Sequence, residues 1–353
     1  MIYCTETIDL SERMEYGISR ASRLIVAGET VVFPTETVYG LGADACSSTA
    51  VDRIFRAKGR PADNPLIVHV DSIDMARGVA AVLPEAAQRL MDAFWPGPLT
   101  LVLPKSGHIP SKVSAGLPTI AVRMPRHEAA LALIGKAGRP IAAPSANLSG
   151  SPSPTTAAHA EQDLRGRVPL ILDGGPCEVG LESTVLDVSG DRPCLLRPGG
   201  VTWEMLEACI GKIEISSGVL CPFDGQAKSP GMKYKHYAPK AKVVLVDGDS
   251  VEEIVREICV RYDAEPGKNR AILATRETAA AYGNRIVETL GSRKQPKTIA
   301  RDFFSVLRRM DEQGVEIIWM ETVELAGLGL AIMNRALRSA GFHVVNGREW
   351  DRC

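Results

Sequence analysis

Aromatic residues are scarce in this chain of 353 residues, and its charges almost cancel. Phe, Trp and Tyr make up 5% of the sequence, which argues against an extensive stacking platform for single-stranded nucleic acid. Lys and Arg number 41 against 42 Asp and Glu, so the net charge is -1 and no whole-molecule positive field attracts a polyanion. Any anionic ligand must therefore be held by a local cluster of cations.

Several catalytic and metal-binding motifs are also missing. None of the eight cysteines falls in a C-x-x-C pair, which disfavours zinc knuckles and redox motifs and favours reduced thiols. No G-x-x-x-x-G-K-[ST] loop, G-x-S-x-G elbow or H-E-x-x-H helix occurs, so any nucleotide must be bound without a Walker loop. No apolar run reaches the roughly 18 residues of a membrane span, and the first residues lack the apolar core of a secretory signal. We therefore expect a cytoplasmic protein that does not enter a membrane.

What is present is the composition of a globular α/β protein, with 45% hydrophobic and 24% charged residues. The length indicates two domains, since one domain usually takes roughly 100–200 residues. Over residues 1–210 strands outnumber helices, which favours a mixed sheet. Residues 211–240 are rich in Pro, Gly and Lys and are typical of a linker. Residues 241–345 alternate four strands with four helices and predict a smaller, doubly wound, Rossmann-like domain.

Hydrophobic periodicity predicts the individual elements. In the first domain we expect helices at 11–29, 49–57, 84–94 and 127–136, and strands at 30–33, 66–70, 99–103, 119–122, 140–143, 170–172 and 183–188. In the second we expect strands at 241–246, 270–274, 285–289 and 317–319, and helices at 250–262, 278–282, 299–313 and 328–340.

Polar segments that follow these strands are candidates for a binding site. A loop of hydroxyls, a carboxylate and glycines is expected over 33–42, and a basic, Pro-rich loop over 56–65. A Ser- and Asn-rich segment spans 140–154, and two shorter candidates lie at 180–187 and 195–200. Each of them, taken singly, is also compatible with an ordinary turn or a solvated loop.

Eight motifs in order carry more information than any one of them: PTETVYGLGADA, KGRPADNPLIVHV, WPGPLTLVL, IAVRMPRH, PIAAPSANLSGSPSPT, LDGGP, LESTVLDV and LRPGG. Together they closely resemble the YrdC-like family. The segment SPGMKYKHYAP, followed by a second α/β domain, is similar to the longer, two-domain threonylcarbamoyl-AMP synthases of that family.

The resemblance implies a twisted mixed sheet with a positively charged cavity, and a nucleotidyltransferase activity. Such an enzyme forms L-threonylcarbamoyladenylate and pyrophosphate from L-threonine, bicarbonate or CO2, and ATP. It implies Mg²⁺ that arrives with ATP and is held mainly by the phosphates, with no metal ligands from the protein. The product would pass to a tRNA threonylcarbamoyl transferase complex for threonylcarbamoyladenosine modification of tRNA. Weak binding of RNA is left open.

The family's functional residues carry over to matching positions of this sequence. Lys58 and Arg60 of the Lys-x-Arg signature are the expected catalytic residues. The expected threonine-binding residues are Thr37, His69, Arg123, Ala143 and Ser183. The expected ATP-binding residues are Arg60, Asn64, Thr119, Ser145, Asn147, Ser153, Arg197 and Tyr234. Tyr237 is the second choice for the linker tyrosine, and the linker segment 229–239 is expected to close over the ligand as a lid.

Two other functions remain as alternatives. The first is an RNA-binding or ribosome-maturation module without catalysis, in which Arg56, Lys58 and Arg60 would bind phosphates. The second is a carbamoyltransferase that uses carbamoyl phosphate. The acylphosphatase-like region and cysteine-rich zinc motifs of such proteins are absent from this sequence, which disfavours the second alternative.

Overall fold

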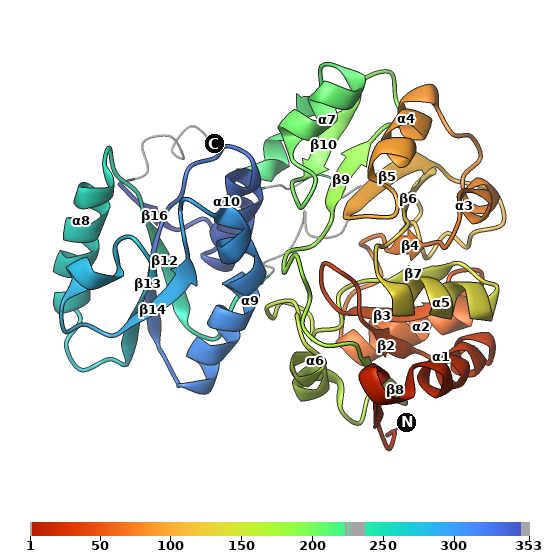
Figure 1. Cartoon of the computed structure of the whole chain (residues 1–353), viewed down its shortest axis with the longest axis horizontal. Coiled ribbons are helices and arrows are strands. Elements are labelled where there is room, and N and C mark those ends of the chain that lie inside the picture. The colour runs from red at the N-terminus through yellow and green to blue at the C-terminus, as the bar shows by residue number, and fades with distance from the viewer. Residues whose placement is uncertain (1, 223–224, 226–236, 347–353) are drawn as a thin grey trace.

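The computed structural model describes residues 2–222, 225 and 237–346, and its elements form two lobes (Figure 1). The first lobe is built on an eleven-stranded mixed sheet with the order β1-β8-β2-β3-β7-β4-β6-β5-β9-β10-β11. The second lobe is built on a five-stranded sheet with the order β14-β13-β15-β12-β16, in which all pairs are parallel. The predicted fold class, a twisted mixed sheet with a smaller doubly wound α/β domain, is confirmed.

The strands of the first lobe are β1 (Glu6–Asp9), β2 (Val31–Phe33), β3 (Gly40–Asp44), β4 (Ile67–His69), β5 (Leu99–Pro104), β6 (Thr119–Arg123), β7 (Ile141–Ala143), β8 (Leu170–Asp173), β9 (Thr184–Asp187), β10 (Cys194–Arg197) and β11 (Glu214–Ile215). Its helices are α1 (Leu10–Val26), α2 (Ser48–Lys58), α3 (Ile73–Val79), α4 (Glu85–Phe94), α5 (Glu128–Ala137), α6 (Ala157–Leu164) and α7 (Trp203–Ile210), and a 3₁₀ turn, η1, spans Ser217–Val219.

The second lobe contains β12 (Lys242–Val246), α8 (Val251–Asp263), β13 (Arg270–Thr275), η2 (Ala279–Tyr282), β14 (Val287–Gly291), α9 (Pro296–Glu312), β15 (Ile317–Glu321), α10 (Leu328–Ser339) and β16 (Val344–Val345). Helix α8 covers the outer face of the sheet, whereas α9 and α10 lie between the sheet and the first lobe (Figure 1). Two details of the prediction for this second lobe are wrong. The segment at 278–282 is a 3₁₀ turn rather than an α-helix, and a fifth strand, β16, pairs beside β12.

The glycine-rich segment at 40–44 is a buried strand, β3, so the expectation of a loop through residue 42 is wrong there. β3 pairs antiparallel with β2 and with β7 in the middle of the sheet. A Cβ atom on Gly42 would lie 2.7 Å from both Ile141 Cγ2 and Phe33 Cε1. The glycine therefore leaves room for neighbouring side chains, which a pattern based on apolar residues cannot detect.

Helix α2 ends at Lys58, inside the stretch that is expected to be a basic loop. The Ser47 hydroxyl caps its first turn by accepting from the Ala50 N–H, and Gly59, with a left-handed backbone (φ 63°), ends it. Arg56 and Lys58 thus belong to the last helical turn, where cations interact favourably with the helix dipole, and not to a loop as expected. The glycine, rather than the later prolines, sets this boundary.

The two lobes share a hydrophobic core. Val38 and Leu181 of the first lobe pack with Tyr237 and with Phe303 and Phe304 of α9 in one buried cluster. At Gly180 (φ 77°) a Cβ atom would lie 2.3 Å from the Arg301 carbonyl oxygen, so α9 approaches the backbone of the first lobe directly. The second lobe is therefore packed against the segment that leads into Glu182 and Ser183.

Within the described residues, no helix combines the length and the apolar character needed to cross a membrane. Cys4, Cys46, Cys177, Cys194, Cys209 and Cys259 are free thiols, whereas Cys221 is disulfide-bonded, so the expectation of reduced cysteines is wrong at that position.

Candidate active site

One cavity of the first lobe gathers basic side chains from separate segments. Lys58 at the end of α2, Arg60 just after it, Arg123 at the end of β6 and Arg197 at the end of β10 all line it. Lys58 and Arg60 are neighbours in the sequence, but Arg123 and Arg197 lie far from them and from each other, so only the fold brings the four side chains together. The cavity is lined further by the expected site residues Thr37, His69, Ala143, Ser145, Asn147 and Ser183.

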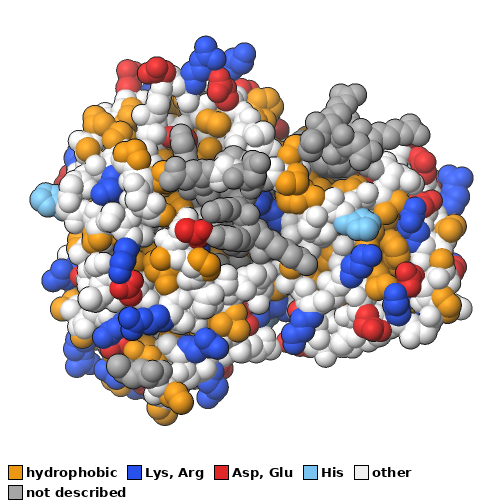
Figure 2. All heavy atoms as spheres, turned by 180° about the vertical axis from the view of Figure 1, so that it is seen from behind, with side chains coloured by type: hydrophobic (Ala, Val, Ile, Leu, Met, Phe, Trp, Pro, Cys, Tyr) orange, Lys and Arg blue, Asp and Glu red, His pale blue; other side chains and the backbone are white. Residues whose placement is uncertain are grey.

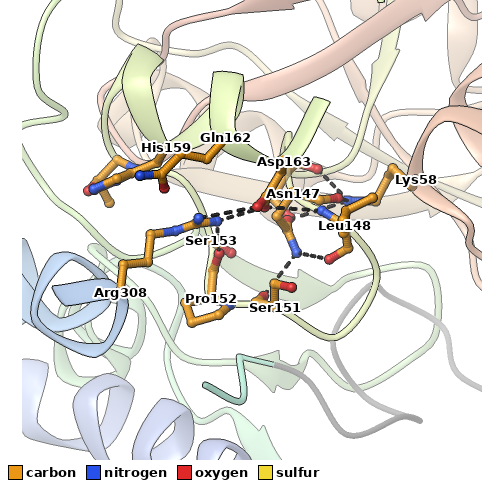
Figure 3. Close-up of polar contacts among 12 residues, drawn as sticks. Lys58, Asn147, Leu148, Ser151, Pro152, Ser153, His159, Gln162, Asp163 and Arg308 are labelled. Carbon is orange, nitrogen blue, oxygen red and sulfur yellow. Dashed lines mark hydrogen bonds and ion pairs between the residues drawn. The ribbon is translucent and has the colours of Figure 1, made fainter. Parts of the chain in front are cut away.

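Lys58 is held by the loop that follows β7. Its Nζ donates to the carbonyl oxygens of Ser145 at 2.5 Å and Asn147 at 2.6 Å, and approaches Asn147 Oδ1 at 3.4 Å (Figure 3). Burial, followed by the charge of Arg60, lowers the pKa of Lys58. Three oxygen acceptors match the three N–H bonds of an ammonium group and so oppose that shift.

Arg123 is anchored on three sides and nearly fully buried. Its Nε donates to the Gly97 carbonyl oxygen at 3.3 Å, Nη1 donates to the Thr37 hydroxyl at 2.9 Å, and Nη2 forms an ion pair with Glu36 at 2.7 Å. Since each terminal nitrogen carries two N–H bonds, these contacts leave capacity for a further acceptor. Such a fixed guanidinium is suited to bind a carboxylate.

His69 ends β4 beside Arg123, in register with it across the β4–β6 pair. Burial, followed by the charge of Arg123, lowers the pKa of His69 to about 3. The imidazole is therefore neutral near pH 7, and its Nδ1 has no partner among the described residues. A neutral ring suits orientation of a ligand better than proton transfer near neutral pH.

Ser183 and Arg197 form a second polar group in the cavity wall. Arg197 donates from Nε to the Ser183 carbonyl oxygen at 3.0 Å and from Nη2 to its hydroxyl at 3.2 Å. The Ser183 hydroxyl also lies 2.8 Å from the Thr100 hydroxyl. Arg197 is thus positioned by both the carbonyl oxygen and the hydroxyl group of Ser183, the residue that precedes β9.

The remaining expected residues within the described part of the chain, Asn64, Thr119 and Ser153, do not line the cavity. Asn64 is fully buried beside Arg60, which donates to the Asn64 carbonyl oxygen at 3.3 Å, and the Asn64 amide group has no hydrogen-bond partner in the described part of the chain. Thr119 begins β6, on the same strand as Arg123. Ser153 is buried and donates to Glu182, which does line the cavity.

Of the two linker tyrosines, Tyr234 lies outside the described residues, as does most of the predicted lid at 229–239. Tyr237, the second choice, is buried and lines the cavity. Its ring centroid lies 5.3 Å from that of Phe304 in α9 and 5.5 Å from the Arg335 guanidinium carbon in α10. One wall of the cavity is therefore supported by the second lobe.

Two carboxylates of this site are not among the residues that the sequence predicts for it. Glu36 precedes Thr37 and pairs with Arg123, and Glu182 precedes Ser183 and pairs with Arg335 at 2.7 Å. Both stand inside the family motifs PTETVYGLG and LESTVLD, where each acid is adjacent to an expected ligand-binding hydroxyl. Acids beside a cluster of cations are expected to form ion pairs with them. The sequence alone does not show which acid pairs with which cation.

The comparisons with known proteins agree with this architecture. A family model described as telomere recombination (Sua5, YciO and YrdC) matches residues 23–199, and one described as threonylcarbamoyl-AMP synthase, C-terminal domain, matches residues 201–341. The chain is 48% identical to a threonylcarbamoyl-AMP synthase of Pyrococcus abyssi over 97% of its own length and 99% of the relative's. The chain belongs to the threonylcarbamoyl-AMP synthase family. It is accordingly an enzyme of the nucleotidyltransferase type.

Other members of the threonylcarbamoyl-AMP synthase family also match this chain over nearly its full length. A Bacillus subtilis member is 48% identical over 93% of this chain and 94% of the relative. A structure of P. abyssi Sua5 complexed with L-threonine is 47% identical, covers 97% of this chain and 98% of that chain, and superposes with a TM-score of 0.90. The similarity to this family therefore extends over both lobes and not only over the lobe with the cavity.

Proposed function

We propose that this enzyme forms L-threonylcarbamoyladenylate and pyrophosphate from L-threonine, bicarbonate or CO2, and ATP. The observation that carries the proposal is the convergence of Lys58, Arg60, Arg123 and Arg197 on one cavity that also contains hydroxyl groups. Lys58, Arg60 and Arg197, together with Mg²⁺, suit a polyphosphate, which carries about four negative charges, and Arg123 suits a carboxylate. Family membership and the threonine complex of the P. abyssi protein support the choice of substrates.

Threonine would bind around Arg123. The guanidinium would hold the substrate carboxylate in a charge-assisted contact worth about 1.5–3 kcal/mol. Thr37 and Ser183 lie within hydrogen-bond distance of Arg123 and Arg197 respectively, so their hydroxyls are placed to orient the amino acid. Neutral His69 and the backbone at Ala143 would complete this subsite.

ATP would bind toward Lys58 and Arg60, with Asn64, Thr119, Ser145, Asn147, Ser153, Arg197 and Tyr234 as the proposed nucleotide residues. The unpartnered amide of buried Asn64 is a group that a ligand can satisfy. Among residues 2–222, 225 and 237–346, no group of three or more His, Cys, Asp or Glu side chains is arranged to hold a metal ion. Mg²⁺ would enter with ATP as part of the substrate, held mainly by phosphate oxygens.

The reaction needs little covalent help from the protein. The threonine amine would add to CO2 to give a carbamate and release a proton, and a carbamate oxygen would attack the α-phosphate as pyrophosphate leaves. Positioning and charge neutralisation by Lys58, Arg60 and Arg197 would supply most of the catalysis. The low pKa of His69, about 3, supports a role in orientation rather than as general base.

We further propose that the adenylate is passed to a tRNA threonylcarbamoyl transferase complex in the cytoplasm. The alternative of a catalytically inert RNA-binding module that uses Arg56, Lys58 and Arg60 is disfavoured by burial, because Lys58 is 3% and Arg60 is 9% exposed, and only Arg56 of the three is exposed. Figure 2 shows Lys and Arg interspersed with Asp and Glu over one face of the molecule rather than gathered into one basic patch. An RNA backbone requires accessible cations.

The test is to incubate the enzyme with ATP, Mg²⁺, bicarbonate and one amino acid at a time and to measure pyrophosphate. Threonine should give the highest rate, and omission of bicarbonate should abolish product formation. Pyrophosphate release that does not depend on threonine would contradict the proposal. Tight, steeply salt-dependent binding of RNA without any turnover would instead support the RNA-binding alternative.

A further inference from the structure

Two arginines of the second lobe reach into the first lobe, where Arg308 contacts the loop that holds Lys58 and Arg335 contacts Glu182, a hydrogen-bond partner of that loop. This loop, residues 144–154, contains Ser145, Asn147 and Ser153 and is called the serine loop here. Arg308 comes from α9 and Arg335 from α10, and both are buried. They lie more than 100 residues beyond the loop in sequence, so only the packing of the two lobes brings them to it.

Arg308 binds the serine loop from the side opposite to Lys58 (Figure 3). Its Nη2 donates to the Pro152 carbonyl oxygen at 2.5 Å and to Asp163 Oδ2 at 2.8 Å. The same Asp163 oxygen accepts from the Leu148 N–H at 3.2 Å. Arg308 therefore fixes the loop both directly and through Asp163.

Arg335 acts on the same loop through a carboxylate. It is fully buried and contacts Glu182 Oε2 from Nε at 2.7 Å, while the other carboxylate oxygen of Glu182 accepts from the Ser153 hydroxyl. Its Nη1 also donates to the Pro198 carbonyl oxygen at 3.0 Å, one residue after Arg197. The arrangement Arg335–Glu182–Ser153 thus connects α10 to the serine loop.

The contact between Arg335 and Glu182 affects the charge that the cavity presents to a ligand. Glu182 lines the cavity, so an uncompensated carboxylate there would repel a triphosphate. Burial alone raises the pKa of Glu182, but Arg335 and then Arg197 lower it overall, so the group stays ionised. Removing Arg335 would leave a buried charge without its partner, and Glu182 would either repel the nucleotide or take up a proton and change its contact with Ser153.

We propose that the second lobe positions the ATP subsite, with Arg308 and Arg335 as positioning residues that hold the serine loop and neutralise Glu182. This inference rests on the proposed function, since it assumes that Ser145, Asn147 and Ser153 bind ATP. In the threonine subsite, Arg123, Thr37 and His69 make none of these contacts, whereas Ser183 follows Glu182, whose carbonyl oxygen accepts from Arg335 Nη2 at 3.2 Å. Loss of either arginine should therefore weaken ATP binding much more than threonine binding, and Arg308 should show the sharper difference.

The experiment compares full-length Arg335→Gln and Arg308→Gln with wild type, by calorimetric titration of ATP with Mg²⁺ and, separately, of threonine. We expect the Kd for ATP to rise about tenfold or more, a typical size for coupling between sites, and the Kd for threonine to stay within about twofold. Arg309→Gln is the matched control, because Arg309 follows Arg308 on α9 but pairs with Glu288 inside the second lobe. It should leave both Kd values unchanged.

A double variant tests whether Arg335 acts through Ser153. Ser153→Ala combined with Arg335→Gln should weaken ATP binding by clearly less than the product of the two single effects, because both variants break one relay. Arg335→Lys, which keeps the charge, should recover part of the affinity. If Arg335→Gln does not fold, Arg308→Gln and Arg335→Lys still decide the question.

Equal weakening of ATP and threonine, or no change in either, would overturn the inference while leaving the proposed function intact. If the double variant raises the Kd for ATP by the full product of the two single effects, Arg335 does not act through Ser153. Wild-type enzyme that binds threonine but no ATP would overturn the nucleotide assignment and the inference with it.

Discussion

Glu36 and Arg123 form a buried ion pair at 2.7 Å, and of the two only Arg123 lines the cavity, where the threonine carboxylate is proposed to bind. The pair has two opposite effects on a carboxylate ligand. Glu36 holds the guanidinium in place, but its negative charge also reduces the attraction that Arg123 exerts on another anion. We therefore expect the acid to contribute to the stability of the fold and to lower the affinity of the proposed subsite for threonine.

The substitution Glu36→Gln separates these effects. Glutamine keeps the size and shape of the side chain and removes the charge, so threonine should bind a few-fold more tightly. The free energy of unfolding should fall, by up to about 3 kcal/mol, because a buried arginine loses its counter-charge. Calorimetry with threonine and urea unfolding would check both; weaker binding of threonine would show that the charge of Glu36 is needed to hold Arg123.

Arg60→Ala and Arg123→Ala should affect different substrates. Arg60 adjoins Lys58 and Asn64, whereas Arg123 adjoins Thr37 and Glu36. The first variant should raise the KM for ATP and the second the KM for threonine, each about tenfold to a hundredfold for the loss of a charge-assisted contact. Steady-state kinetics with each substrate varied in turn would measure the split. Identical effects on both substrates would show that the cavity is not divided as proposed.

His69 should make the folded state sensitive to acid. Its pKa is lowered by burial and Arg123 to about 3, below the value near 6.5 of an unfolded chain. The unfolded state therefore takes up the proton first as the pH falls. This contribution to stability is complete above about pH 6.5 and is lost progressively toward pH 3, by about 2 kcal/mol between pH 7.5 and pH 5.

Asparagine in the variant His69→Asn does not titrate. The difference in free energy of unfolding between wild type and this variant should therefore be about 2 kcal/mol smaller at pH 5 than at pH 7.5. Urea unfolding of both proteins at the two pH values measures the difference, and the other histidines cancel because they are common to both. A deficit that does not change with pH would mean that His69 has the same pKa in the folded and the unfolded protein.

Gly42→Ala should destabilise the protein by about 1–3 kcal/mol, because the added methyl group would overlap Ile141 and Phe33 in the packed sheet. Gly78→Ala is the matched control. Gly78 lies in α3, where an added Cβ atom would have nothing within 4 Å, and alanine there should leave the melting temperature unchanged or slightly higher. Equal melting temperatures for the two variants would contradict the packing role of Gly42.

The sequence predicts best where periodic apolar residues cover a regular element. Helix α4 and strand β6 lie within one residue of their expected bounds, because their burial follows the apolar pattern. Strand β3 escapes prediction, since its glycines contribute no side chains to that pattern. The family resemblance predicts the basic cavity. It does not predict the ion pairs of Glu36 with Arg123 and of Glu182 with Arg335, because only the fold brings these residues together.

Arg335 shows the limit of prediction most clearly. It stands in an amphipathic segment whose apolar residues predict a packed helix and nothing more. Its contact with Glu182 spans 153 residues of sequence, and no local motif encodes it. Tyr237 is a similar case, because its place in the cavity wall depends on Phe304 and Arg335 of the second lobe.

The bare backbone of Gly180 beneath Arg301 has a mechanical consequence. Because glycine has no side chain, the backbone of α9 lies directly against the backbone at Gly180, and no side-chain rearrangement can absorb a displacement of the helix. A sideways displacement of α9 would therefore displace the backbone that leads to Glu182, two residues later. The two lobes are thus expected to move together at this contact.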